Sequence, residues 1–118
     1  GSAPNALCVT RVKMLWDDEY LYIGAELTSD FAVVAKAVER NAVIYQTDSD
    51  FEVFVDAEGS CHGYKELEVN AKNTVWNLML NRPYADGGGE RSARVATEGE
   101  ADYYEVNGQC TATRVLSG

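Results

Sequence analysis

The sequence predicts an all-β protein: an antiparallel β-sandwich of the jelly-roll or immunoglobulin-like type, with about seven or eight strands. Two observations predict this class. Apolar side chains recur at every second position in several short segments, which is the period of half-buried antiparallel strands. Pairs of residues that favour tight turns separate the segments, namely Asp17-Asp18, Lys72-Asn73 and Asn107-Gly108.

The expected strands succeed one another along the chain with short connections. We predict strands over 8–16, 19–27, 51–56, 64–72, 74–80, 93–96, 102–106 and 110–115. Only residues 31–40 are compatible with a helical turn. Residues 83–90 contain three consecutive glycines and are predicted to form a flexible loop.

Composition and charge limit the classes of function. The chain has 118 residues, of which 46% are hydrophobic, so it is long and apolar enough to bury the core of one domain. Its 19 acidic and 10 basic residues give a net charge of −9, which disfavours nucleic acid and anionic membranes as partners. No apolar run approaches the length of a membrane span, which is about 20 residues. Neutral polar molecules, cations and basic proteins remain compatible partners.

The beginning of the chain and its cysteines carry little further information. We expect no signal peptide, because no charged segment followed by an apolar segment opens the sequence. Residues 1–2, Gly1-Ser2, resemble the remnant of an affinity tag, which leaves 3–118 as a single domain.

The three cysteines, Cys8, Cys61 and Cys110, allow either one disulfide with a free thiol or three buried thiols.

Acidic residues are concentrated on two neighbouring expected strands. Seven acidic residues and one basic residue lie between positions 41 and 70. Alternation places Glu66, Glu68 and Asn70 in a row on one strand face, with successive members about 6.5–7 Å apart. Glu52 lies beside this row if the two strands pair. Three aromatic residues belong to the same part of the sequence: Tyr45, Tyr64 and Trp76.

This combination suits a neutral sugar. Carboxylates accept hydrogen bonds from hydroxyl groups, and an aromatic ring packs against the apolar face of a pyranose. The alternative is a solvated acidic face with the aromatic residues in the core. Trp76 allows both interpretations, because it shares a strand face with Leu78 and Leu80.

Three further motifs each allow two interpretations. The loop from Asp56 to His62 carries oxygen donors around a glycine, so Asp56 and Glu58 are candidate ligands of a structural calcium ion or members of an ordinary polar turn. No other cofactor is expected. Arg82 and Tyr84 enter the glycine-rich loop and line either a site rim or a plain surface loop. Glu66 and Glu68 have the spacing of an inverting glycosidase, but neighbours on one strand do not flank a bond from opposite sides.

Two stretches resemble the carbohydrate-binding module family 9-like domains. One is RVKMLWDDEYLYIGAEL, over 11–27, and the other spans 40–88 and includes YQTDSDFEVFVDAEG and YKELEVNAKNTVWNLML. The chain resembles a family member shortened at both ends. The resemblance implies an antiparallel β-sandwich that holds a sugar between two tryptophan rings, with calcium ions supporting the loops. It also implies a non-catalytic, secreted or extracytoplasmic module.

The resemblance transfers to individual residues only in part. Tyr45 occupies the position of the first stacking tryptophan, and Glu52 matches the sugar-binding glutamate. Glu66 and Glu68 fall near a glutamine and an arginine of the family, while Asn70 matches a retained asparagine. The second stacking tryptophan has no counterpart.

These observations lead to one expected function and its alternatives. We expect a non-catalytic module that binds a glucan- or xylan-type carbohydrate through its acidic, aromatic-flanked face. The expected ligand-binding residues are Tyr45, Glu52, Glu66, Glu68, Asn70, Trp76 and Arg82. A structural β-sandwich that dimerises through unpaired strand edges is the main alternative. A glycoside hydrolase is the other.

Overall fold

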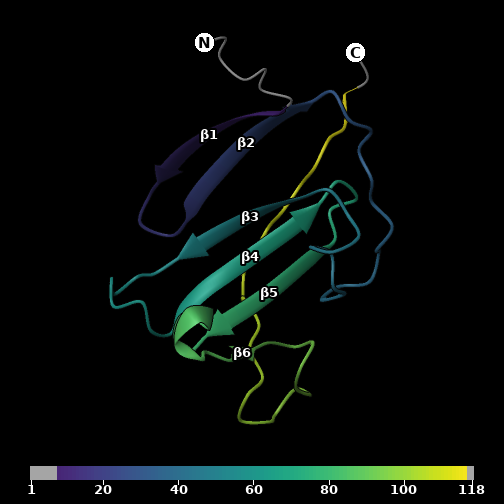
Figure 1. The fold of residues 1–118 in the computed structure, drawn as a ribbon. Helices are drawn as coiled ribbons and strands as arrows, with labels where there is room; N and C mark the ends of the chain where they lie inside the picture. The colour runs from purple at the N-terminus through teal and green to yellow at the C-terminus, as the bar shows by residue number, and fades with distance from the viewer. Residues whose placement is uncertain (1–7, 117–118) are drawn as a thin grey trace, which may run out of the picture. The chain divides into compact units, whose positions relative to one another are not determined.

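A computed structural model describes residues 8–116, which form six β-strands, one 3-10 helix and no α-helix (Figure 1). The predicted tag remnant, Gly1-Ser2, lies outside the described residues. The chain divides into two compact units, the first ending at Ala32 and the second beginning at Val33. The part of the chain that the structure describes contains no helix suited to cross a membrane.

The first unit is a β-hairpin. Strands β1 (Cys8–Trp16) and β2 (Leu21–Ser29) pair antiparallel over their full lengths. The turn forms because the Asp17 carboxylate accepts hydrogen bonds from the backbone N–H groups of Glu19 and Tyr20, both at 2.8 Å. The predicted hairpin turn at Asp17-Asp18 is therefore confirmed. A ribbon of two strands has no core of its own.

The second unit is built on a four-stranded antiparallel sheet. Its strands are β3 (Asp50–Val55), β4 (Tyr64–Asn70), β5 (Val75–Leu80) and β6 (Glu90–Arg91). Their order in the sheet is the order of the chain, β3-β4-β5-β6, as Figure 1 shows. A long connection between β5 and β6 carries the 3-10 helix η1 (Tyr84–Asp86).

Asn70 organises the end of β4. It is only 1% exposed, and its side-chain oxygen accepts hydrogen bonds from the N–H groups of Lys72 and Thr74 in the turn to β5. Its amide nitrogen donates to the carbonyl of Ala37, at 3.0 Å, and to Asp48 Oδ2, at 2.7 Å. One buried amide thus connects the predicted turn at Lys72-Asn73 to the segment that precedes β3.

The core of this unit lies on the same sheet face as the acidic row. Ile44, Trp76, Leu78 and Leu80 form the buried apolar cluster. In the antiparallel register Glu68 is opposite Trp76, and residues opposite each other point to the same face. Glu66, Glu68 and Asn70 are 8%, 2% and 1% exposed, so the row is buried and not solvated, whereas the core position that the alternative gave Trp76 is confirmed. Trp76 belongs to the core.

The chain after β6 differs from the prediction. Residues 93–96, 102–106 and 110–115 form turns and extended segments, not strands. They are held by scattered hydrogen bonds, such as Ala93 N–H to the Tyr104 carbonyl and Thr113 Oγ1 to the Ala71 carbonyl. No ladder pairs these segments, and their burial does not alternate: residues 110–115 are all exposed, and residues 103–106 are all half-buried. The described residues contain six strands rather than seven or eight.

Three smaller predictions also change. Residues 31–40 contain no helical turn, and the short strand β6 begins at the end of the expected flexible loop. The predicted turn at Asn107-Gly108 forms without flanking strands. Cys8, Cys61 and Cys110 are all free and exposed, so neither alternative for the cysteines holds.

In the connection between β5 and β6, the backbone leaves no room for a side chain at Gly88. A Cβ atom on Gly88 would lie 1.9 Å from the carbonyl oxygen of Arg82 and 2.7 Å from that of Pro83. The Gly88 N–H donates to the same Pro83 carbonyl, at 3.0 Å. A Cβ on the adjacent Gly89 would meet nothing within 4 Å.

We predict that Gly88→Ala destabilises the protein by about 1–3 kcal/mol or more, because backbone must move to relieve the clash. Urea unfolding monitored by tryptophan fluorescence measures the change. Gly89→Ala is the matched control and should leave the midpoint nearly unchanged. Equal effects of the two substitutions would contradict the steric explanation.

Candidate functional site

All four strands of the second unit's sheet contribute to one pocket. It has a volume of about 350 Å³, and its lining combines aromatic rings with carboxylates: Tyr45, Glu52, Glu66, Glu68, Trp76, Tyr84 and Glu90. Small-molecule sites in proteins begin at about 300 Å³. The pocket is therefore large enough for a small ligand.

Strand register brings the pocket residues together. Glu52 of β3 is directly opposite Glu68 of β4, and Glu68 is directly opposite Trp76 of β5. These three side chains consequently form a row across the sheet on one face. Glu66 lies two residues from Glu68 on the same strand, so its side chain points to the same face.

The aromatic side of the pocket is a supported tyrosine ring. The rings of Tyr45 and Trp76 stack with their centroids 5.3 Å apart and an interplanar angle of 17°. Tyr45 is 49% exposed, whereas Trp76 is 3% exposed. The Arg94 guanidinium also lies 4.6 Å from the centroid of the indole ring. Trp76 thus holds the Tyr45 ring in place, and Tyr45 presents aromatic surface to solvent.

The acidic side of the pocket is poorly solvated. Glu66 is 8% exposed and Glu68 is 2% exposed, and the Oε2 atom of each is buried without a hydrogen-bond partner among residues 8–116. Burial, followed by the neighbouring charges of Glu52, Glu66 and Asp50, raises the pKa of Glu68 to about 8. Burial and then Glu52 also raise the pKa of Glu66. The pocket therefore concentrates carboxyl groups, and the raised pKa keeps Glu68 largely protonated near neutral pH.

The rim of the pocket comes from the connection between β5 and β6. Burial and then the charge of Glu66 raise the pKa of Tyr84 to about 12, so its hydroxyl stays protonated and can donate a hydrogen bond. Glu90 forms an ion pair with Arg94 four residues later. Arg94 thereby joins the rim carboxylate to the Trp76 ring.

Five of the seven residues predicted to bind ligand line this pocket, and two do not. Asn70 lies in the same row but is occupied by its four hydrogen bonds in the β4–β5 turn. Arg82 is exposed and donates to the Gly87 carbonyl at 3.3 Å, which holds the loop. The residues brought together are Tyr45, Glu52, Glu66, Glu68 and Trp76.

The predicted calcium ligands lie elsewhere. Asp56 Oδ2 accepts a hydrogen bond from the Cys61 N–H at 2.7 Å, which closes the polar turn after β3. Asp56 and Glu58 are exposed. Within residues 8–116, the group of three carboxylates close enough to share an ion is Asp50, Glu52 and Glu68. The geometry around Asp56 fits the alternative of an ordinary turn.

Sequence reasoning did not single out Glu90, which lines the pocket, or Asp50, which lies close to Glu52 and Glu68. Glu90 comes after the three glycines and carries no pattern that points to the pocket. Asp50 belongs to the acid-rich segment. Because it is two residues from Glu52 on the same strand, the alternation of side chains could have placed it on the same face as Glu52. Tyr84 had a rim or a plain surface loop as its predicted alternatives, and the structure places it in the lining.

A half-buried carboxylate, Glu105, lies on the opposite face of the sheet. Asn77 comes directly after Trp76 and therefore points to the other face, where its amide donates to Glu105. Glu105 also accepts hydrogen bonds from Arg40, at 2.9 and 3.0 Å, and from Asn41 at 2.8 Å. Burial would raise the pKa of Glu105, but these hydrogen bonds outweigh it and hold the pKa at about 2.

The second unit thus carries a pocket lined by aromatic rings and carboxyl groups. The family model of the carbohydrate family 9 binding domain-like proteins matches residues 2–109. The chain therefore belongs to this family, and carbohydrate binding is the function that membership implies. Comparisons with curated proteins and with solved structures gave no significant match.

We predict a pH-dependent contribution of Glu105 to stability. Its pKa in the folded protein, about 2, is below the ordinary value of 4.5, so its stabilising effect is complete above about pH 4.5. The effect is lost as the pH falls toward 2. Urea unfolding at several pH values should show wild type more stable than Glu105→Gln near neutrality, with the difference shrinking below pH 4.5.

The exposed residue Glu98 provides the control for this experiment. Glu98→Gln should track the wild-type profile at every pH. A wild-type advantage over Glu105→Gln that stays constant down to pH 2 would contradict the role assigned to the Glu105 charge.

Proposed function

We propose that the pocket of the second unit binds a neutral saccharide of the glucan or xylan class, and that the protein is a non-catalytic carbohydrate-binding module. The observation that carries this proposal is the convergence of an exposed, supported tyrosine ring and several carboxylates in one pocket. Membership in the carbohydrate family 9 binding domain-like family supports the ligand class.

The lining offers groups for both parts of a sugar: an aromatic surface for its apolar C–H face, and polar atoms for its hydroxyl groups. Tyr45 offers an aromatic face for the C–H groups of a pyranose. Glu52, Glu66 and Glu68 offer carboxylate oxygens that accept hydrogen bonds from hydroxyl groups. The Tyr84 hydroxyl adds a donor at the rim. A pocket of about 350 Å³ favours recognition of one or two sugar units over a long chain.

Catalysis receives no support from the same residues. Glycosidases place two carboxyl groups on opposite sides of the bond they cleave. Glu66 and Glu68 are neighbours on one face of β4, and Glu52 is opposite Glu68 on the adjacent strand. All three carboxylates therefore approach a ligand from the sheet side.

Three further expectations remain part of the proposal. The first is the β-sandwich class that the sequence predicts. A secreted or extracytoplasmic location would give the module access to polysaccharides. A homodimer would pair through β3, which has a strand partner on one side only among the described residues. Light scattering tests this last point.

Isothermal titration with glucose, cellobiose, xylobiose and soluble glucans tests the proposed ligand class. We expect measurable heat at millimolar sugar, since small modules with one stacking ring bind individual sugars weakly. The absence of heat with every sugar, both with added calcium and with a chelator, would contradict carbohydrate binding.

We predict that Tyr45→Ala weakens sugar binding roughly tenfold, which corresponds to about 1.4 kcal/mol, because the stacking surface is lost. Tyr20→Ala is the matched control, since Tyr20 is an equally exposed tyrosine outside the pocket lining. Titration of both variants with the best sugar measures the effect. Equal affinities for the two variants would show that the Tyr45 ring does not stack on the ligand.

A further inference from the structure

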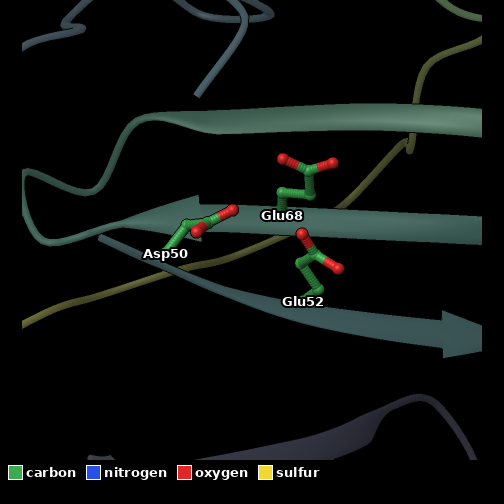
Figure 2. A group of neighbouring side chains, drawn as sticks. All are labelled: Asp50, Glu52 and Glu68. Atoms are coloured by element: carbon green, nitrogen blue, oxygen red, sulfur yellow. The ribbon is translucent and has the colours of Figure 1, made fainter. Parts of the chain in front are cut away.

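Three carboxylates on β3 and β4 lie close enough to share a metal ion. Asp50 and Glu52 are two residues apart on β3, and Glu68 is opposite Glu52 on β4. One oxygen from each of the three lies within 4.8 Å of the other two. Figure 2 shows the three side chains on the same side of the two strands, with the carboxylates of Glu52 and Asp50 directed toward that of Glu68.

An independent observation shows that this group lacks a partner. Glu68 is 98% buried, as its 2% exposure implies, and its Oε2 atom has no hydrogen-bond partner within residues 8–116. The Asp50 Oδ2 atom is likewise buried and unpartnered. Burying a carboxylate without compensation is costly, so buried charges are normally paired or bound to metals.

Other polar side chains of the second unit do find partners within the protein, in contrast to this cluster. Asn70, at the end of the same strand, uses both its side-chain oxygen and its nitrogen in hydrogen bonds. Glu105, on the opposite face, is paired with Arg40. None of the four ion pairs in residues 8–116 includes Asp50, Glu52 or Glu68. The protein therefore supplies no positive charge to this cluster.

The all-carboxylate ligand set favours a hard divalent cation, and calcium is the more tolerant of irregular geometry. Calcium takes six to eight oxygen ligands at about 2.3–2.6 Å, so two of its ligands lie up to about 5 Å apart. Magnesium binds oxygens at about 2.1 Å and holds them within about 4.2 Å. Magnesium also demands near-ideal octahedral geometry, whereas calcium accepts the irregular set of oxygens that three separate carboxylates and water provide. Glu52 is exposed, which leaves the cluster open to solvent for entry of the ion.

We propose that Asp50, Glu52 and Glu68 form a calcium site in the floor of the pocket, in place of the predicted site at Asp56 and Glu58. The three carboxylates supply the protein ligands, and water completes the coordination. The ion neutralises the acidic side of the pocket and satisfies the buried oxygens of Glu68 and Asp50. This site does not depend on the proposed sugar function, because it requires only the geometry of β3 and β4.

The test uses the whole chain, treated with a chelator and dialysed, with no sugar present. Saturating calcium should raise the melting temperature by at least about 4 °C, which is the effect of a ligand that binds only the folded state. Terbium, which replaces calcium, should show luminescence on excitation of tryptophan, because Glu68 is opposite Trp76 in the sheet. Absence of both responses would overturn the proposal.

Two variants locate the ion. Glu68→Gln keeps the shape of the side chain and removes the carboxyl group that would ionise to ligate calcium, so it should fold and bind calcium at least tenfold more weakly. Glu98→Gln, at an exposed position outside the cluster, should bind calcium as wild type does. Unchanged calcium affinity in Glu68→Gln, or a loss caused instead by Glu58→Gln, would overturn the assignment.

Sugar titrations of the calcium-loaded and the chelated protein keep this proposal separate from the proposed function. Calcium binding without sugar binding contradicts only the carbohydrate ligand. Sugar binding without any calcium or terbium response contradicts only the metal site.

Discussion

The register of β4 between β3 and β5 is the constraint on which the rest of the second unit depends. It places Glu68 opposite both Glu52 and Trp76, so a carboxylate pair and the core tryptophan share one row. A slip of one residue would turn the whole row to the other face of the sheet. The buried amide of Asn70 pins this register at the end of the strand, because it is bonded to the β4–β5 turn and to the segment before β3.

The two faces of this sheet treat buried carboxylates in opposite ways. Glu105 receives hydrogen bonds from an arginine and two asparagines, which stabilise its charged form and lower its pKa. Glu68 is surrounded by other carboxylates, and its pKa is raised. The first arrangement contributes to folding, whereas the second leaves electrostatic energy that only a bound proton, cation or ligand can relieve. This contrast is the physical basis for proposing that the pocket, and not the opposite face, binds a ligand.

Trp76 connects the core to the site. Its ring packs with Ile44 and Leu78, and the same ring supports the exposed ring of Tyr45. The sequence left core packing and ligand stacking as competing interpretations, because alternation reports only which face a residue occupies. The structure assigns Trp76 to the core and makes Tyr45 the aromatic surface of the pocket. Because the Trp76 ring already holds Tyr45 in place, Tyr45 loses less conformational entropy when it binds a ligand.

The sequence alone determined the hairpin, the strands β3 to β5, the acidic row and the family resemblance, because alternation and turn chemistry are local properties. Tertiary structure decided the features that depend on long-range contacts. Residues 93–115 alternate like strands but find no ladder partner, and they bond instead to side chains such as Asn77. Asn70 lies in the acidic row, but its side chain forms hydrogen bonds in the β4–β5 turn. Glu90 lines the pocket, although no sequence pattern predicts this. The burial that leaves Glu68 without a partner depends on all the segments packed around it, which no single stretch of sequence specifies.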